Sequence, residues 1–125
     1  LGMLVWQDMV SGGEYIGTML AGVAPFFGIN VKDDKYKAFK RGEKKWRDEF
    51  KRELNEMLNQ LFNHTCISVW VPFNEGWGQF ESTGVYRKIK ELDDSRFVAS
   101  TSGWFKGGES DVLSEHCYFK QFKPR

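Results

Sequence analysis

The segment "CISVWV", residues 66–71, constrains the fold of this chain more than any other. It is an apolar run rich in β-branched and aromatic residues, without the polar alternation of a strand that has one face in water. Such a run is typical of a strand buried on both faces. The segment therefore predicts an interior strand that other parts of the chain cover from both sides.

An amphipathic helix is predicted directly before this strand. From about Glu43, apolar residues recur at three- and four-residue spacing while charged residues fill the opposite face. These apolar residues are Trp46, Phe50, Leu54, Met57, Leu58, Leu61 and Phe62. Asn63 suits the C-terminal end of this helix. A second helix is indicated by Val85, Ile89 and Leu92.

Three further segments predict strands: "GMLVWQDM" (residues 2–9), "RFVAS" (96–100) and "DVLSEHCYF" (111–119). Residues 20–42 show no clear apolar period and predict a loop with a short helix at most. Strands that alternate with helices over such distances form βαβ units and a parallel sheet. The predicted fold class is therefore α/β.

Composition limits the size of the chain and its partners. Its 125 residues allow one domain, over residues 1–125. The 18 basic and 17 acidic side chains leave a net charge of +1, so we expect neither nucleic acid nor a membrane surface as a partner. Basic residues crowd between Lys32 and Arg52, but interleaved acidic residues predict a solvated face there.

The cysteines and histidines predict neither a disulfide nor a metal site. Cys66 and Cys117 lack the C-x-x-C spacing of zinc or redox sites, and we expect them to be buried free thiols. One begins a strand and the other ends one, so a parallel sheet would hold them far apart. Neither His64 nor His116 has a second residue at ligand spacing, and no cofactor is expected.

Polar and aromatic residues follow several of the predicted strands. Parallel strands bring their carboxyl ends to one edge, where the sites of α/β proteins lie. Asp8, Glu75, residues 100–104 and residues 116–118 would therefore share one rim, although they lie far apart in the sequence.

Glu75 ends the buried strand beside Trp77, and apolar surroundings would favour the protonated carboxyl that a general acid needs. By pattern alone, an ion-paired or solvated glutamate is the commoner alternative. The rings of Trp77, Trp104 and Tyr118 suit the C–H faces of sugars, and the alternative is that some of them cap the core.

The stretch "HTCISVWVPFNEGWGQF" resembles the fourth-strand motif of glycoside hydrolase family 2, the β-galactosidase, β-glucuronidase and β-mannosidase group. "GMLVWQDM" is similar to the third strand of that family, "DDSRFVASTSGW" to its fifth strand and following loop, and "DVLSEHCYF" to its sixth. The resemblance spans nearly the whole chain and implies strands 3 to 6 of a (β/α)₈ TIM barrel that hydrolyses β-glycosides with retention.

The resemblance also implies roles for individual residues. Glu75 would be the general acid/base, and Asn74 would bind the 2-hydroxyl of the sugar. Asp8 would contact substrate, and Tyr118 would lie close to the nucleophile of the family. The sugar pocket would be lined by His116 and Trp104.

Retaining hydrolysis requires two carboxyl groups, and the segments that resemble the family supply only one of them, Glu75. The nucleophile of the family is a glutamate on the seventh strand, and this chain corresponds to about half of a barrel of roughly 250 residues. We therefore expect a fragment that is inactive alone and self-associates through exposed barrel edges.

Two other functions compete with this one. A carbohydrate-binding α/β module would use the same aromatic and carboxylate residues without cleavage. An open flavodoxin-like domain with an assembly role is disfavoured, because no phosphate-binding glycine motif follows any strand. The sequence leaves the choice of sugar open.

Overall fold

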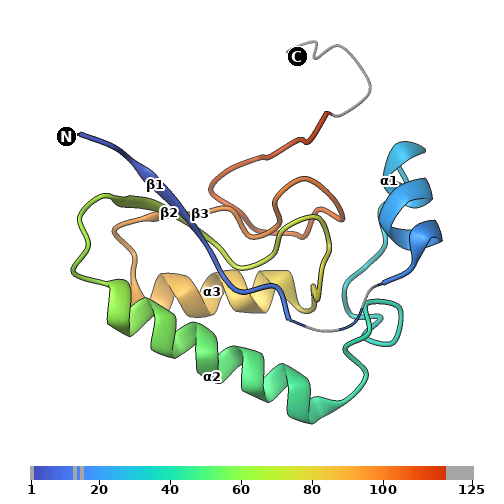
Figure 1. The fold of residues 1–125 in the computed structure, drawn as a ribbon, viewed down its shortest axis with the longest axis horizontal. Helices are drawn as coiled ribbons and strands as arrows, with labels where there is room; N and C mark the ends of the chain where they lie inside the picture. Colours follow the sequence, from blue (N-terminus) through green and yellow to red (C-terminus); the bar gives the residue numbers. More distant parts are fainter. Residues whose placement is uncertain (1, 13, 15, 118–125) are drawn as a thin grey trace.

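Three parallel strands form the sheet of the computed structural model, which describes residues 2–12, 14 and 16–117. The strands are β1 (Val5–Asp8), β2 (Ile67–Val71) and β3 (Phe97–Val98), in the order β1-β2-β3. Both pairs run parallel, and β2 is the central strand (Figure 1). The predicted α/β class is confirmed, with β2 at the predicted interior position.

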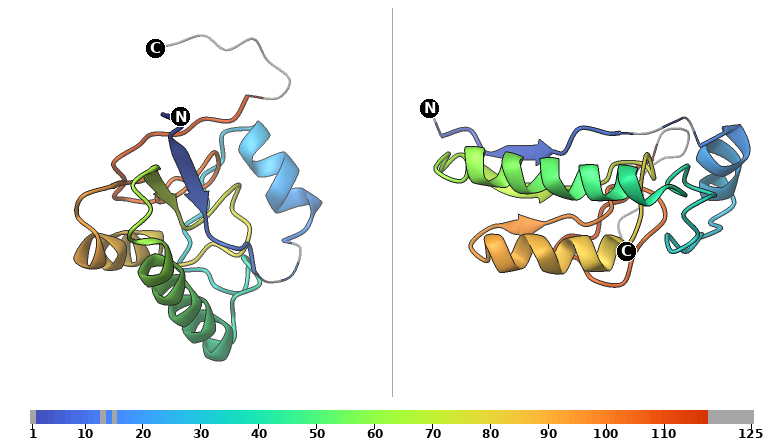
Figure 2. Two further views of the ribbon diagram at one scale, coloured as in Figure 1. Left: turned by 60° about the vertical axis from the view of Figure 1, so that its left-hand side comes forward. Right: turned by 90° about the horizontal axis from the view of Figure 1, so that it is seen from below.

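Two helices cover one face of this sheet (Figure 2). They are α2 (Lys44–Leu61) and α3 (Ser82–Leu92), close to the predicted bounds. Glu43 is extended at the start of α2, and the extended backbone of Asp93 ends α3. The segment predicted as a loop, residues 20–42, includes most of η1 (Met19–Val23), a π-helical turn, and the short α1 (Ala24–Phe26), and no other helix or strand lies in it.

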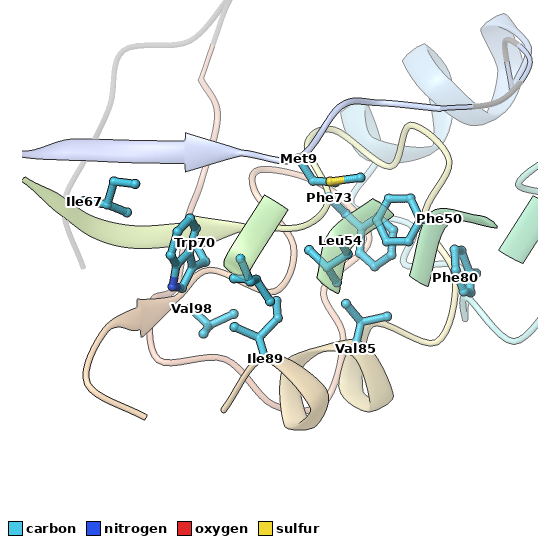
Figure 3. Close-up of a cluster of buried hydrophobic side chains, with 11 residues drawn as sticks. Met9, Phe50, Leu54, Ile67, Trp70, Phe73, Phe80, Val85, Ile89 and Val98 are labelled. Carbon is cyan, nitrogen blue, oxygen red and sulfur yellow. The ribbon is translucent and has the colours of Figure 1, made fainter. Parts of the chain in front are cut away.

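The main core lies between the sheet and these two helices (Figure 3). Phe50, Leu54 and Leu58 come from α2, at the predicted spacing. The strands contribute Ile67, Trp70 and Val98, and α3 contributes Val85 and Ile89. Helical periodicity thus buries one stripe of α2 and one of α3 against the same interior. β2 departs from strict alternation, because its pairing with β1 is irregular between Val5 and Trp6.

Trp70 is fully buried and connects this core to a polar cluster at the end of α3. Its indole N–H donates to Asp93 Oδ2 at 2.8 Å, and Arg96 donates to the same oxygen at 2.6 Å. Burial opposes the charge of Asp93, yet hydrogen bonds from Ser95, Arg96 and Trp70 outweigh it and lower the pKa of Asp93 to about 2.

The strand predicted over residues 111–119 is wrong for residues 111–117, and residues 118–119 lie outside the described residues. Side chains occupy the outer edge of β3 instead of a backbone ladder. The Asp111 carboxylate accepts from Val98 N–H at 2.9 Å, and Ser110 Oγ donates to Val98 O at 3.1 Å. Within the described residues, the segment makes one backbone hydrogen bond to β3, from Asp111 N–H to Val98 O at 2.9 Å.

The same segment covers part of the second face of the sheet, where Val112 packs against Val69, Val71 and Ala99 (Figure 1, orange to red). The prediction of buried cysteines is also wrong: Cys66 and Cys117 are both free, as expected, but both are exposed. None of the described helices combines the length and the apolar character needed to cross a membrane.

Candidate functional site

The loops after β2 and β3 are joined just beyond the carboxyl ends of the strands. Asn74 and Ser102 form a parallel bridge that prolongs the β2-β3 pairing. The Ser102 N–H donates to Phe73 O and the Glu75 N–H donates to Ser102 O, both at 2.8 Å. This short extension of the ladder fixes the backbone on both sides of the candidate site.

Glu75 has a left-handed backbone, with φ of 53°. A residue with a side chain in this region costs about 1 to 3 kcal/mol and persists where its surroundings enforce it, often at functional sites. Gly76 follows with φ of 72°, and a Cβ atom there would overlap the ring of Phe105. The tight turn directly after Glu75 therefore needs glycine at position 76.

His116 links the two loops through both nitrogens of its ring. Its Nδ1 lies 2.9 Å from Glu75 Oε1, and its Nε2 lies 3.0 Å from Ser102 Oγ. The Glu75 and His116 side chains are only 19% and 23% exposed, so their contact is partly shielded from water. Gly103, with φ of 91°, lets the ring lie against its backbone, since a Cβ there would come within 2.7 Å of Cγ and Nδ1.

Asp8 belongs to the same neighbourhood. Desolvation by neighbouring protein atoms raises the pKa of Asp8, although the residue remains exposed, and the positive charge of a protonated His116 opposes this rise. Asp8 is the last residue of β1, whereas Glu75 follows β2 and His116 follows β3. Residues from three separate segments thus gather beyond the carboxyl ends of the parallel strands.

The predicted aromatic residues are placed less uniformly. Trp104 is half-buried and packs against a second apolar cluster that contains Ile16, Phe39 and Phe105. That placement fits the alternative in which a ring caps the core. Trp77 is half-buried, and its backbone N–H donates to Asn74 O at 3.1 Å. Tyr118 lies outside the described residues.

Sequence reasoning missed the role of Arg41, which the charge pattern assigned to a solvated face. Arg41 is 4% exposed, and its Nε donates to Gly78 O at 2.9 Å while Nη2 donates to Gly12 O. Burial lowers the pKa of Arg41. The guanidinium joins the loop after β1 to the loop after β2, and no periodic signal in residues 20–42 could have indicated this.

The sequence pattern also assigns no individual role to Gln79 or Ser102. Gln79 is fully buried and its amide donates to Phe105 O at 2.7 Å and to Asp33 Oδ2 at 2.9 Å. A glutamine flanked by glycine and phenylalanine in "GWGQF" was the available signal for a buried amide. Within the described ranges, no group of three or more His, Cys, Asp or Glu side chains is arranged to hold a metal ion.

No protein-family model matches this chain, and no curated protein matches it. The candidate site therefore has to be interpreted from its own geometry and from the sequence motif around Glu75.

Proposed function

We propose that this chain forms the general acid/base part of a retaining β-glycosidase of the family 2 type, with Glu75 as the acid/base. In that proposal the three strands belong to a (β/α)₈ barrel, and the nucleophile comes from a further strand. The observation that carries the proposal is the convergence of Asp8, Glu75 and His116 beyond the carboxyl ends of parallel strands, where barrel enzymes act.

The chemistry of the site supports this function. A general acid must deliver its proton to one atom of the substrate, so its carboxyl group has to be held in one orientation. The hydrogen bond from His116 and the left-handed backbone restrict Glu75 in this way. Asn74, next to it, supplies an amide that suits a sugar hydroxyl, and Asp8 supplies a carboxylate for a second one.

The enzymatic test uses a polypeptide that continues this sequence through the expected nucleophile strand. With β-glycosides of poor leaving groups, Glu75→Gln should lower kcat/KM by about 10²- to 10⁴-fold, because departure then depends on protonation. With activated aryl β-glycosides the first step should change much less. Glu109→Gln is the matched control, because Glu109 pairs with Arg87 away from the site.

A loss that is equal for all leaving groups would contradict the acid/base role. For the chain of 125 residues alone, we expect no turnover of aryl β-glycosides, because retention needs two carboxyl groups about 5 to 5.5 Å apart. Sustained hydrolysis by the chain alone, abolished by Glu75→Gln, would show that it supplies its own nucleophile.

A non-catalytic carbohydrate-binding module is the second candidate function, favoured by Trp77, which is half-buried beside Asn74 and Glu75. Titration of the chain with methyl β-glycosides, followed by tryptophan fluorescence, addresses it directly. Sugar binding that Glu75→Gln leaves unchanged, together with no turnover by the longer polypeptide, would favour the binding module.

A further inference from the structure

The side chains of Ser102, His116 and Glu75 form a continuous hydrogen-bonded series. Ser102 Oγ lies 3.0 Å from His116 Nε2, and His116 Nδ1 lies 2.9 Å from Glu75 Oε1. Each ring nitrogen therefore has one defined neighbour. The ring itself is held against Gly103, where only a residue without Cβ leaves room for it.

The donor and acceptor properties of these groups restrict the imidazole to one tautomer. An ionised carboxylate only accepts hydrogen bonds, so Nδ1 must carry the proton when Glu75 is charged. Nε2 of a neutral ring then has to accept, and the Ser102 hydroxyl can donate to it. In this arrangement both ring nitrogens of His116 are satisfied, and a satisfied polar network holds its members in one arrangement.

We propose that His116 is the positioning residue of Glu75: fixed by Ser102 and Gly103, it carries its neutral-form proton on Nδ1 and holds the Glu75 carboxylate at the strand ends. This inference rests on the proposed function, since positioning matters for Glu75 as an acid/base. The hydrogen-bonded series itself can be tested without any substrate. Among the described residues, Glu75 and Asp8 are titratable groups that act on the ring, Glu75 by its hydrogen bond and Asp8 by its charge.

The same connectivity occurs in hydrolases that use a serine nucleophile, where the acid orients the histidine and the histidine activates the serine. The surroundings of Ser102 favour positioning over nucleophilic attack. Ser102 is 8% exposed, and its hydroxyl lies 3.4 Å from Ser114 Oγ on another side. Its backbone N–H and C=O are both engaged in the extended ladder, by Phe73 and Glu75.

The test is nitrogen-15 NMR of the histidine rings of the chain, using two-bond correlations that separate the Nδ1–H and Nε2–H tautomers. The chain contains two histidines, so His64→Gln assigns both sets of signals without touching the site. At about pH 8, where an ordinary histidine is neutral and a carboxylate is charged, we expect His116 in the Nδ1–H form and His64 mainly in the Nε2–H form that free imidazole prefers.

Two substitutions separate the contributions of the neighbours. Glu75→Gln should abolish the selection, because a glutamine amide can either accept from Nδ1 or donate to it, and the Nε2–H form should become the major one. Ser102→Ala should leave the Nδ1–H form dominant, because Glu75 still requires a donor. An Nε2–H ring in the wild-type chain, or a spectrum that Glu75→Gln does not change, overturns the proposal.

Gly103→Ala tests the positioning without altering any group of the series. The new Cβ would displace the ring, so the Nδ1–H selection should be lost while the core signals remain. Gly28→Ala is the matched control, because Gly28 also has positive φ but open space at Cβ. If Gly103→Ala does not fold, the Glu75→Gln spectrum decides.

Two further outcomes have distinct meanings. Covalent labelling of Ser102 by a fluorophosphonate would show a nucleophilic serine and would overturn the positioning role. A confirmed Nδ1–H ring together with a failure of the leaving-group test would leave the hydrogen-bonded series standing and would reject the glycosidase function.

Discussion

Asp93 is expected to make the stability of this protein depend on pH, and Asp93→Asn isolates its contribution. Asparagine has the shape of the protonated acid and keeps an oxygen for the Trp70 indole, but it lacks the negative charge that Arg96 faces at 2.6 Å. The Asp93 side chain is 1% exposed, so water can screen this charge only weakly.

The magnitude follows from the pKa of Asp93, which falls from 3.8 to about 2 in the folded protein. At about 1.4 kcal/mol per pH unit, this difference corresponds to roughly 2 to 3 kcal/mol. Because the folded pKa is the lower one, the contribution is fully present above pH 3.8 and is lost as the pH falls through about 2.

The assay is urea denaturation at a series of pH values, followed by tryptophan fluorescence. At pH 7, Asp93→Asn should lower the free energy of unfolding by about 2 to 3 kcal/mol, and the difference from wild type should shrink by about 2 kcal/mol as the pH falls to 2. The exposed neighbour provides the control, since Asp94→Asn should change stability by less than about 0.5 kcal/mol. A difference from wild type that stays constant with pH would refute this reasoning.

Two other substitutions test the packing of the site and the edge of the sheet. Gly78→Ala should lower the free energy of unfolding by about 1 to 3 kcal/mol more than Gly28→Ala does, as measured by urea denaturation. Both glycines have positive φ, but only a Cβ at position 78 would overlap Arg41 and the Gly12 carbonyl oxygen. Equal losses would mean that the loop moves aside. Trp6→Lys should weaken the self-association expected at β1, as measured by sedimentation velocity. Trp46→Lys should not, because Trp46 lies on α2, although it is 50% exposed and Trp6 is 51% exposed. Equal effects would point to non-specific association through exposed tryptophans.

Most regular elements could be predicted because their signals are local. The apolar stripe of α2 and the apolar run of β2 predict which residues are buried, and the alternation of strand and helix predicts parallel pairing. Parallel pairing in turn predicted that Asp8 and Glu75 would approach the same rim. The barrel beyond these three strands stays a prediction.

The errors arose where side chains took the place of backbone partners. Residues 111–117 have the apolar content of a strand. Ser110 and Asp111, however, use their side chains to bind the edge of β3, and the described segment adds a single backbone bond there, from Asp111 N–H to Val98 O. Arg41 was assigned to a solvated face because its neighbours in the sequence are charged, whereas its hydrogen-bond acceptors lie 29 and 37 residues away.

The sequence by itself determined the two longer helices, the three observed strands and the common edge at which these parallel strands end, because periodic burial depends on neighbours a few residues apart. Only the tertiary structure decided that His116 lies between Glu75 and Ser102, that Gly103 makes room for it, and that Arg41 is buried. These contacts depend on the paths of loops that are far apart in the sequence, and those paths are set by hydrogen bonds and close packing that leave no period in the chain.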